Sequence, residues 1–267
     1  MRILTSVLLS LLAAGCGDGG NSTPDQGMAP DMAAQPEGVK LEITCTDSIA
    51  SIYADPGPLP ADKGAIIHCA KDKDITANEI QALLTSEGTT IRPVTSGAHV
   101  YRILYRTERG DAANTPGYSS GLLFLPDTPR AAKLPMVVAS HGSRGQAGLC
   151  AASKGDPAAD AVKADFDRLI YAFLGYGYAV LAPDLAGYAN YGAAGNPPSA
   201  YGSNADVGKS TLDGARAMKK LIPSSLLDQV ALVGVSQGGA TTLSALQLSD
   251  TYGAGAPVTA VVAFAPL

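Results

Sequence analysis

A serine near the end of the sequence stands between an apolar run that ends at Val233 and a helical pattern. The local sequence is Gly234, Val235, Ser236, Gln237, Gly238 and Gly239. Small residues two places before and two places after a serine allow a sharp, strained turn that leaves the hydroxyl exposed. Such a serine can attack a carbonyl carbon, and amides at the following helix N-terminus can stabilise the developing negative charge. We therefore predict that Ser236 is a nucleophile; an ordinary glycine-rich turn is the alternative.

A second group that could take part in this chemistry is His-Gly-Ser at 141–143, directly after the apolar run Met136–Ser140. In loops of this kind, one backbone amide after the His-Gly pair and the amide after the nucleophile hold the oxyanion of a tetrahedral intermediate. We predict the amides of Ser143 and Gln237 as these two donors. His141 is expected to pack within its own loop and to hydrogen-bond there, without a catalytic role.

These groups are positioned by alternating strand and helix patterns, which predict an α/β sheet with flanking helices. The expected strands are His99–Tyr105, Ser120–Leu125, Leu134–Ser140, Tyr178–Ala182, Gln229–Val233 and Val258–Ala265. The expected helices are Asp160–Leu174, Ala205–Leu221 and Gly238–Leu248. The first two strands are expected to be antiparallel neighbours of an otherwise parallel sheet. Asp184, after the fourth strand, is expected to fix its loop.

The N-terminus has the pattern of a secretion signal. Residues 1–15 place Arg2 before an apolar run that is too short to span a bilayer comfortably. The signal ends in Leu-Ala-Ala-Gly followed by Cys16, which resembles the bacterial lipobox. We predict that Cys16 carries lipid and anchors the protein to a membrane of the bacterial cell envelope. The alternative is an ordinary signal peptide and a secreted protein. Residues 16–38 are expected to form a flexible tether, and residues 39–267 the folded domain.

Composition excludes several classes. Hydrophobic residues make up 46% and charged residues 16% of 267, which is too apolar for a chain disordered throughout. The net charge is −5 and no Lys/Arg-rich run occurs, so nucleic acid is not an expected partner. No cofactor motif is present, and the three histidines and the cysteines lack metal-ligand spacing, so we expect no cofactor and no metal.

Three cysteines follow Cys16. In an oxidising compartment, Cys45 and Cys69 are the natural disulfide pair. Cys150 is then left either as a small buried apolar residue or as a thiol that needs a partner outside this chain.

Several segments, in this order, resemble the secretory lipase family of the α/β-hydrolase superfamily and its bacterial lipoprotein relatives. The resemblance extends from about Tyr53 to Leu267. The segments are Tyr53–Pro60, Gly64–Ile67, Tyr101–Thr107, Ser119–Pro126, His141–Ser143 with Cys150–Ser153, Leu212–Ala217 and Ser236–Gly239. Within them we expect Asp213 and Arg216 to form an ion pair one helical turn apart.

The resemblance implies hydrolysis of carboxylic esters by a Ser-His-acid triad on small-molecule or lipid substrates. Superfamily order places the acid and then the histidine after the nucleophile. No histidine follows Ser236, and the only later acid, Asp250, follows a helix instead of a strand. We therefore expect that the fold stops after the strand that follows the nucleophile helix, and that the 267-residue chain is almost inactive. His99 or His141 could replace the missing base only through an unusual topology.

A non-catalytic, hydrolase-like lipoprotein that binds a ligand or partner is the alternative function. Two further expectations concern the surface. Residues 188–208 carry Tyr188, Tyr191 and Tyr201 and either roof the site or form a solvated loop. The last strand, Val258–Ala265, is expected to leave an apolar sheet edge exposed.

Overall fold

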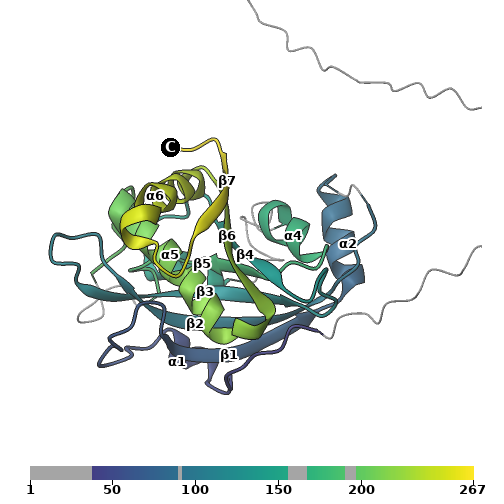
Figure 1. The fold of residues 1–267 in the computed structure, drawn as a ribbon, viewed down its shortest axis with the longest axis horizontal. Helices are drawn as coiled ribbons and strands as arrows, with labels where there is room; N and C mark the ends of the chain where they lie inside the picture. The colour runs from purple at the N-terminus through teal and green to yellow at the C-terminus, as the bar shows by residue number, and fades with distance from the viewer. Residues whose placement is uncertain (1–37, 90–91, 156–166, 190–196) are drawn as a thin grey trace, which may run out of the picture. The chain divides into compact units, whose positions relative to one another are not determined.

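A mixed sheet forms the centre of the protein in the computed structural model, which describes residues 38–89, 92–155, 167–189 and 197–267 (Figure 1). Its seven described strands are β1 (Ile66–Ile75), β2 (Ala98–Glu108), β3 (Pro116–Pro126), β4 (Leu134–Ser140), β5 (Val180–Pro183), β6 (Leu226–Val235) and β7 (Val258–Phe264). They lie in the order β1-β2-β3-β5-β4-β6-β7. The pairs from β1 through β3 to β5 are antiparallel, and β5, β4, β6 and β7 are parallel. The predicted change from antiparallel to parallel pairing is confirmed.

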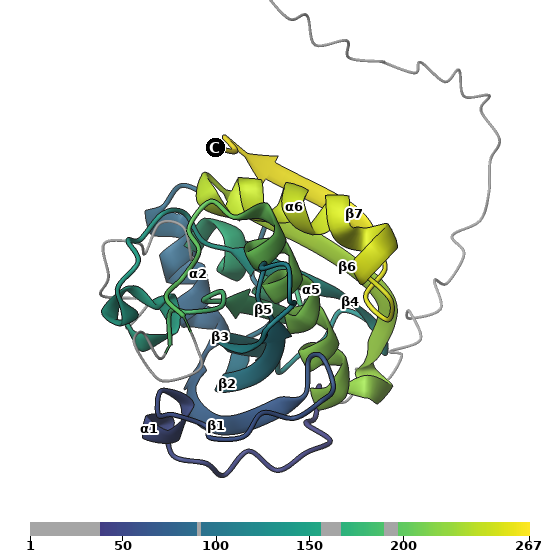
Figure 2. The ribbon, with the colours of Figure 1, turned by 90° about the vertical axis from the view of Figure 1, so that its left-hand side faces the viewer.

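Helices cover both faces of this sheet (Figures 1 and 2). On one face lie α5 (Asn204–Leu221) and α6 (Gln237–Tyr252), and on the other α2 (Ala77–Ser86) and α4 (Ala172–Leu174). Successive residues of one strand point to opposite faces, so Leu123 packs with α5 and Leu122 with α2 and α4. The central strands are apolar throughout because both of their faces are buried.

Only part of the helix predicted over Asp160–Leu174 lies within the described residues. Residues 160–166 lie outside the described residues, and the remainder forms a π-helical turn over Asp167–Tyr171 that leads into α4. The helix ends at Leu174 as predicted, because the chain turns at Gly175 and again at Gly177, where φ is +79°.

Strand β1 and helix α2 are among the elements that were not predicted. The edge strand β1 carries alternating lysine and aspartate at 71–74 and irregular register there, so its sequence lacks a clear apolar period. For α2 a signal was present: Thr76 and Glu79 form a capping box, in which each side chain accepts from the other residue's backbone amide.

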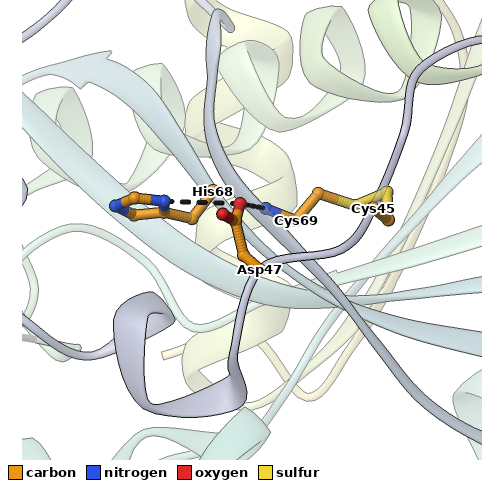
Figure 3. Close-up of a disulfide and its surroundings, with 4 residues drawn as sticks. All are labelled: Cys45, Asp47, His68 and Cys69. Carbon is orange, nitrogen blue, oxygen red and sulfur yellow. Dashed lines mark hydrogen bonds and ion pairs between the residues drawn. A yellow bond between two sulfur atoms is a disulfide. The ribbon is translucent and has the colours of Figure 1, made fainter.

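The expected disulfide between Cys45 and Cys69 is present in the structure (Figure 3). It links the N-terminal segment to β1 across a sequence separation of 24 residues. Asp47 reinforces the link, since its carboxylate accepts from the Cys69 amide at 2.8 Å and lies 3.4 Å from His68 Nδ1 (Figure 3). The segment that follows, including α1 (Ile49–Ile52), is thereby held against β1.

At the opposite end of the described sheet, β7 is the edge strand, and several of its apolar side chains are exposed. Val262 is 46% and Phe264 52% accessible, in agreement with the expected apolar edge. None of the helices within the described residues is long and apolar enough to cross a membrane. The predicted signal (1–15), the lipidated Cys16 and the tether through residue 37 lie outside the described residues.

Candidate active site

Ser236 lies at the turn that joins β6 to α6, with backbone angles φ 54° and ψ −115°. A residue with a Cβ is strained in this region, at a cost of about 1–3 kcal/mol, and stays there only if its surroundings hold it. Two hydrogen bonds hold it here: the Ser236 amide donates to Phe264 O at 2.9 Å, and the Ser236 carbonyl accepts from Ala240 N at 3.0 Å. The end of β7 therefore supports the turn from outside its own sequence.

The glycines around Ser236 are required by backbone contacts. A Cβ at Gly234 would lie 2.2 Å from Gly238 O, and one at Gly238 would lie 2.0 Å from Ser140 O. At Gly239 the nearest atom, Phe264 O, would be 2.8 Å away. All three distances are shorter than real Cβ contacts allow. These glycines are needed because the first residues of α6 lie in direct contact with the ends of β4 and β7.

The hydroxyl of Ser236 does not cap its helix. Serine at an N-cap normally accepts a hydrogen bond from an amide of the first turn, but Ser236 makes no side-chain cap bond to α6. Its side chain is therefore left for other chemistry, at the positive end of a 16-residue helix. Gln237, the first residue of α6, is buried and brings its amide to this end.

The loop predicted to donate the second amide lies next to this turn. β4 pairs in parallel with β6, and Ser140 is in register with Gly234. A Cβ built at Gly238 would also lie 2.7 Å from His141 O, so the start of α6 is close to the first residue of the loop after β4. The structure therefore brings the two predicted oxyanion elements together at the carboxyl ends of adjacent strands. That the backbone amides of Ser143 and Gln237 donate to the oxyanion stays a prediction.

We call residues 141–154 the oxyanion segment. Its side chain Ser143 hydrogen-bonds Tyr201 through the two hydroxyls, 2.6 Å apart, and Gln146 Nε2 donates to Ser199 O at 3.2 Å. Ser199 and Tyr201 therefore contact this segment; both belong to residues 188–208, for which the roof and the solvated loop are the two interpretations. Tyr191, which belongs to the same interpretation, lies outside the described residues.

His141 is a buried member of this segment. Its Nδ1 lies 2.6 Å from Gly142 O, and its ring meets Tyr188 edge-on with 6.1 Å between the centroids. Burial lowers the pKa of His141 below its ordinary value, so the ring is neutral near pH 7. No hydrogen bond joins it to Ser236 among the described residues. These contacts agree with the predicted packing role.

The other two histidines lie far from Ser236. His99 is the second residue of β2, which is separated from β6 by β3, β5 and β4. Four strand spacings of about 4.8 Å therefore put β2 and β6 about 19 Å apart. His99 Nδ1 contacts Asp74 at 2.6 Å, at the end of the sheet opposite the turn. His68 lies on β1, one strand further away, beside Asp47.

Two buried acidic residues, Asp184 and Asp213, have structural partners. Asp184 is buried and binds serines, which agrees with a role in fixing its loop. Asp213 and Arg216 form the expected ion pair on α5, and burial raises the pKa of Asp213. Asp250 lies thirteen residues after Gln237 on α6, about 20 Å from the turn at 1.5 Å per residue.

Cys150 is a free thiol, half-buried in a small apolar cluster with Ala151, Leu185 and Val207. Its Sγ fills the space in front of Gly145, where a Cβ would lie 3.0 Å away. Its surroundings thus match the apolar interpretation. No cluster of His, Cys, Asp or Glu within the described ranges could hold a metal ion.

The fold and this turn define an α/β-hydrolase architecture, and comparison with known proteins agrees. Residues 157–263 match the secretory lipase family. The cell wall degrading esterase LipA of Xanthomonas oryzae, in a ligand-bound form, has a TM-score of 0.58 at 20% identity, over 77% of this chain and 51% of that one. Candida antarctica lipase A in its closed state has a TM-score of 0.55 at 20% identity, over 79% and 45%. No curated protein matches the chain.

The chain therefore has the α/β-hydrolase fold, and its resemblance to the secretory lipase family is confirmed over residues 157–263. It spans about half the length of the solved structures that it matches. Sequence reasoning named Tyr53, Tyr188 and Tyr201 but did not predict that these three side chains hydrogen-bond the oxyanion segment. Their only signal was a concentration of tyrosine near loops, which is also typical of surface connections.

We predict that Gly238→Ala lowers the free energy of unfolding by about 3 kcal/mol, because the new Cβ overlaps Ser140 O and forces α6 away from β4. Denaturant unfolding measures the change. Gly57→Ala is the control: open space surrounds Gly57, so no overlap arises, and only its positive φ of +67° costs about 1 kcal/mol. Equal losses in the two variants would contradict the contact.

We predict that buried, neutral His141 makes the protein less stable in mild acid. The unfolded chain binds a proton at a pKa of about 6.5, whereas the folded protein resists it, so the unfolding free energy falls as pH drops below about 6.5. His141→Gln cannot titrate, so its stability deficit relative to the wild type should shrink between pH 7.5 and 5.5. Urea unfolding across that range tests this, and parallel pH profiles would refute it.

Proposed function

We propose that the protein is an exported serine carboxylesterase or lipase that hydrolyses acyl esters with Ser236 as the nucleophile. The observation that carries the proposal is the strained Ser236 turn, whose hydroxyl does not cap α6 and whose glycines pack directly on the end of β4. A protein that only binds a ligand would not need a serine in this costly conformation. The family match and the esterase and lipase folds among its structural relatives support ester chemistry.

The proposed reaction has two steps. Ser236 Oγ attacks the ester carbonyl carbon, a base takes the hydroxyl proton, and the carbonyl oxygen becomes an oxyanion held by the amides of Gln237 and Ser143. The intermediate collapses, the C–O bond to the alcohol breaks, and the alcohol leaves with that proton. Water then attacks the acyl-serine in the same way, which releases the carboxylic acid and restores Ser236.

The base and its acid are proposed to lie in sequence that continues after Leu267. Two observations support this: the chain spans about half the length of the solved structures that it matches, and neither His68 nor His99 lies near Ser236. His141 lies near enough in topology, but it is neutral, buried and bonded within its own loop.

We also propose that Cys16 carries lipid after cleavage of residues 1–15 and holds the enzyme on the bacterial cell envelope. The lipobox-like sequence before Cys16 supports the anchor, and the secretory family match supports export. A diacyl anchor places the hydrolase domain near a membrane surface while the intervening residues provide reach. The expected partners are thus an ester substrate and the membrane.

We predict that a fluorophosphonate probe labels Ser236 in a chain extended by its native continuation, and that this chain hydrolyses p-nitrophenyl esters. Ser236→Ala should abolish labelling and lower turnover by about 10⁴-fold or more, since the nucleophile is lost. Gel fluorescence and absorbance assays measure these outcomes.

Ser244→Ala is the matched control, because Ser244 is a buried serine of the same helix whose hydroxyl only donates to Ala240 O at 2.8 Å. Its labelling should equal that of the wild type. Undiminished labelling in Ser236→Ala would refute the nucleophile. Strong Ser236-dependent turnover by the 267-residue chain alone would refute a base located after Leu267.

For the anchor, we predict that Cys16→Ser moves the protein from the membrane fraction to the soluble fraction and removes incorporated labelled palmitate. The thioether-linked lipid needs the thiol, whereas serine cannot accept it. Fractionation and metabolic labelling in a bacterial host make the measurement, with Cys150→Ser as the control that should stay on the membrane. A soluble, unlabelled wild type would favour an ordinary signal peptide.

A further inference from the structure

The loop that follows β5 contacts the oxyanion segment at two separate points. We call residues 184–188 the β5 loop. At the first point, the Ser153 amide donates to Asp184 Oδ1 at 2.7 Å, and the Ser153 hydroxyl donates to Asp184 Oδ2. Ser120 on β3 also donates its hydroxyl to Oδ2. Asp184 is fully buried, so this carboxylate ties the far end of the oxyanion segment to the sheet.

At the second point, Tyr188 holds the near end of the segment. Its hydroxyl donates to Gly145 O at 2.7 Å, two residues after the proposed donor Ser143. The ring is buried and packs edge-on against His141. Tyr188 therefore touches the segment on both sides of Ser143.

Between these two contacts the β5 loop is strained. Leu185 has φ +75°, which is rare for a residue with a branched side chain, and it is buried against Ala151 of the oxyanion segment. Such a backbone persists only where the surroundings determine it strongly. The strain indicates that the loop is fixed tightly enough to position what it binds.

Outer contacts support the first point. Tyr53 and Ser153 hydrogen-bond through their hydroxyls at 2.8 Å, and Arg102 donates to Tyr53 Oη at 3.2 Å and to Ser153 O. A buried carboxylate is costly unless donors surround it, and here the Ser153 amide and the hydroxyls of Ser153 and Ser120 are the donors. Loss of the charge at Asp184 should therefore weaken the hold on Ser153.

We propose that Asp184 and Tyr188 are positioning residues that clamp the oxyanion segment so that the Ser143 amide faces Ser236. This inference rests on the proposed function. Neither side chain touches the reacting atoms in this scheme. Both act through the segment that carries the donor, and a donor displaced by a fraction of an ångström loses most of its effect on the transition state.

The test compares Asp184→Asn and Tyr188→Phe with two matched controls in the chain that carries its native continuation. Asp213→Asn alters another fully buried carboxylate, which accepts from Tyr252 Oη at 2.7 Å and Thr107 Oγ1 at 2.8 Å, away from the segment. Tyr105→Phe removes another buried hydroxyl, which donates to Ser210 O at 3.0 Å. Each control removes the same kind of group as a clamp variant, a buried carboxylate charge or a buried tyrosine hydroxyl, but at a position that does not contact the oxyanion segment.

We expect both clamp variants to lower kcat for p-nitrophenyl butyrate by about 10- to 100-fold with little change in KM. Affinity for phenylboronic acid, which forms a tetrahedral adduct with the serine, should fall by a similar factor. The controls should keep kcat in their folded fraction, even where they lose stability. Unchanged kcat and boronate affinity in both clamp variants would overturn the proposal.

Hydrogen–deuterium exchange provides a readout that does not need activity. Peptides from residues 141–154 should exchange faster in Asp184→Asn and Tyr188→Phe than in the wild type, and not in the two controls. Equal exchange in all four variants would overturn the clamp. A wild type without Ser236-dependent turnover would instead overturn the proposed function, and the exchange result would still decide whether the clamp exists.

Discussion

The close approach of α6 to the end of β4 is the contact on which the rest of the site depends. Only glycine fits at Gly238, where a Cβ would lie 2.0 Å from Ser140 O. This contact sets the helix N-terminus, the strained Ser236 and the loop after β4 beside one another. If the helix stood one side chain further out, Ser236 and the oxyanion segment would no longer lie side by side. The glycine pattern is therefore a packing requirement before it is a catalytic one.

Buried polar groups hold the segments that surround this contact. Asp184 anchors the oxyanion segment through Ser153, and Arg109 anchors the backbone of Pro197 and Pro198. The Arg109 guanidinium pairs with Asp206 at 2.8 Å and donates to Pro198 O at 2.8 Å, with both charged side chains buried. Pairs of this kind add little net stability, but removing one partner is costly because the other charge stays buried. They specify where loops lie, which is what a preorganised site requires.

The strand order of the sheet also limits which histidine could act as a base for the proposed nucleophile Ser236. The parallel strands β4 and β6 have their carboxyl ends at the same end of the sheet, so the loops that follow them meet. His99, near the start of β2, lies at the opposite end of the sheet. His141 lies at the correct end, but burial lowers its pKa and its Nδ1 is engaged with Gly142 O. Position, protonation and hydrogen bonding together separate a packing histidine from a catalytic one.

The sequence by itself determined the central strands, the α5 and α6 patterns, the Ser236 turn and the pairing of Cys45 with Cys69. Each rests on a local signal, such as apolar periodicity, glycine spacing or cysteine arithmetic. Only the tertiary structure decided that β1 forms the sheet edge, that Asp184 and Tyr188 grip the oxyanion segment, and that Phe264 O supports the Ser236 amide. These contacts join residues about 30 or more positions apart, and their specificity comes from burial and geometry, which no local pattern encodes.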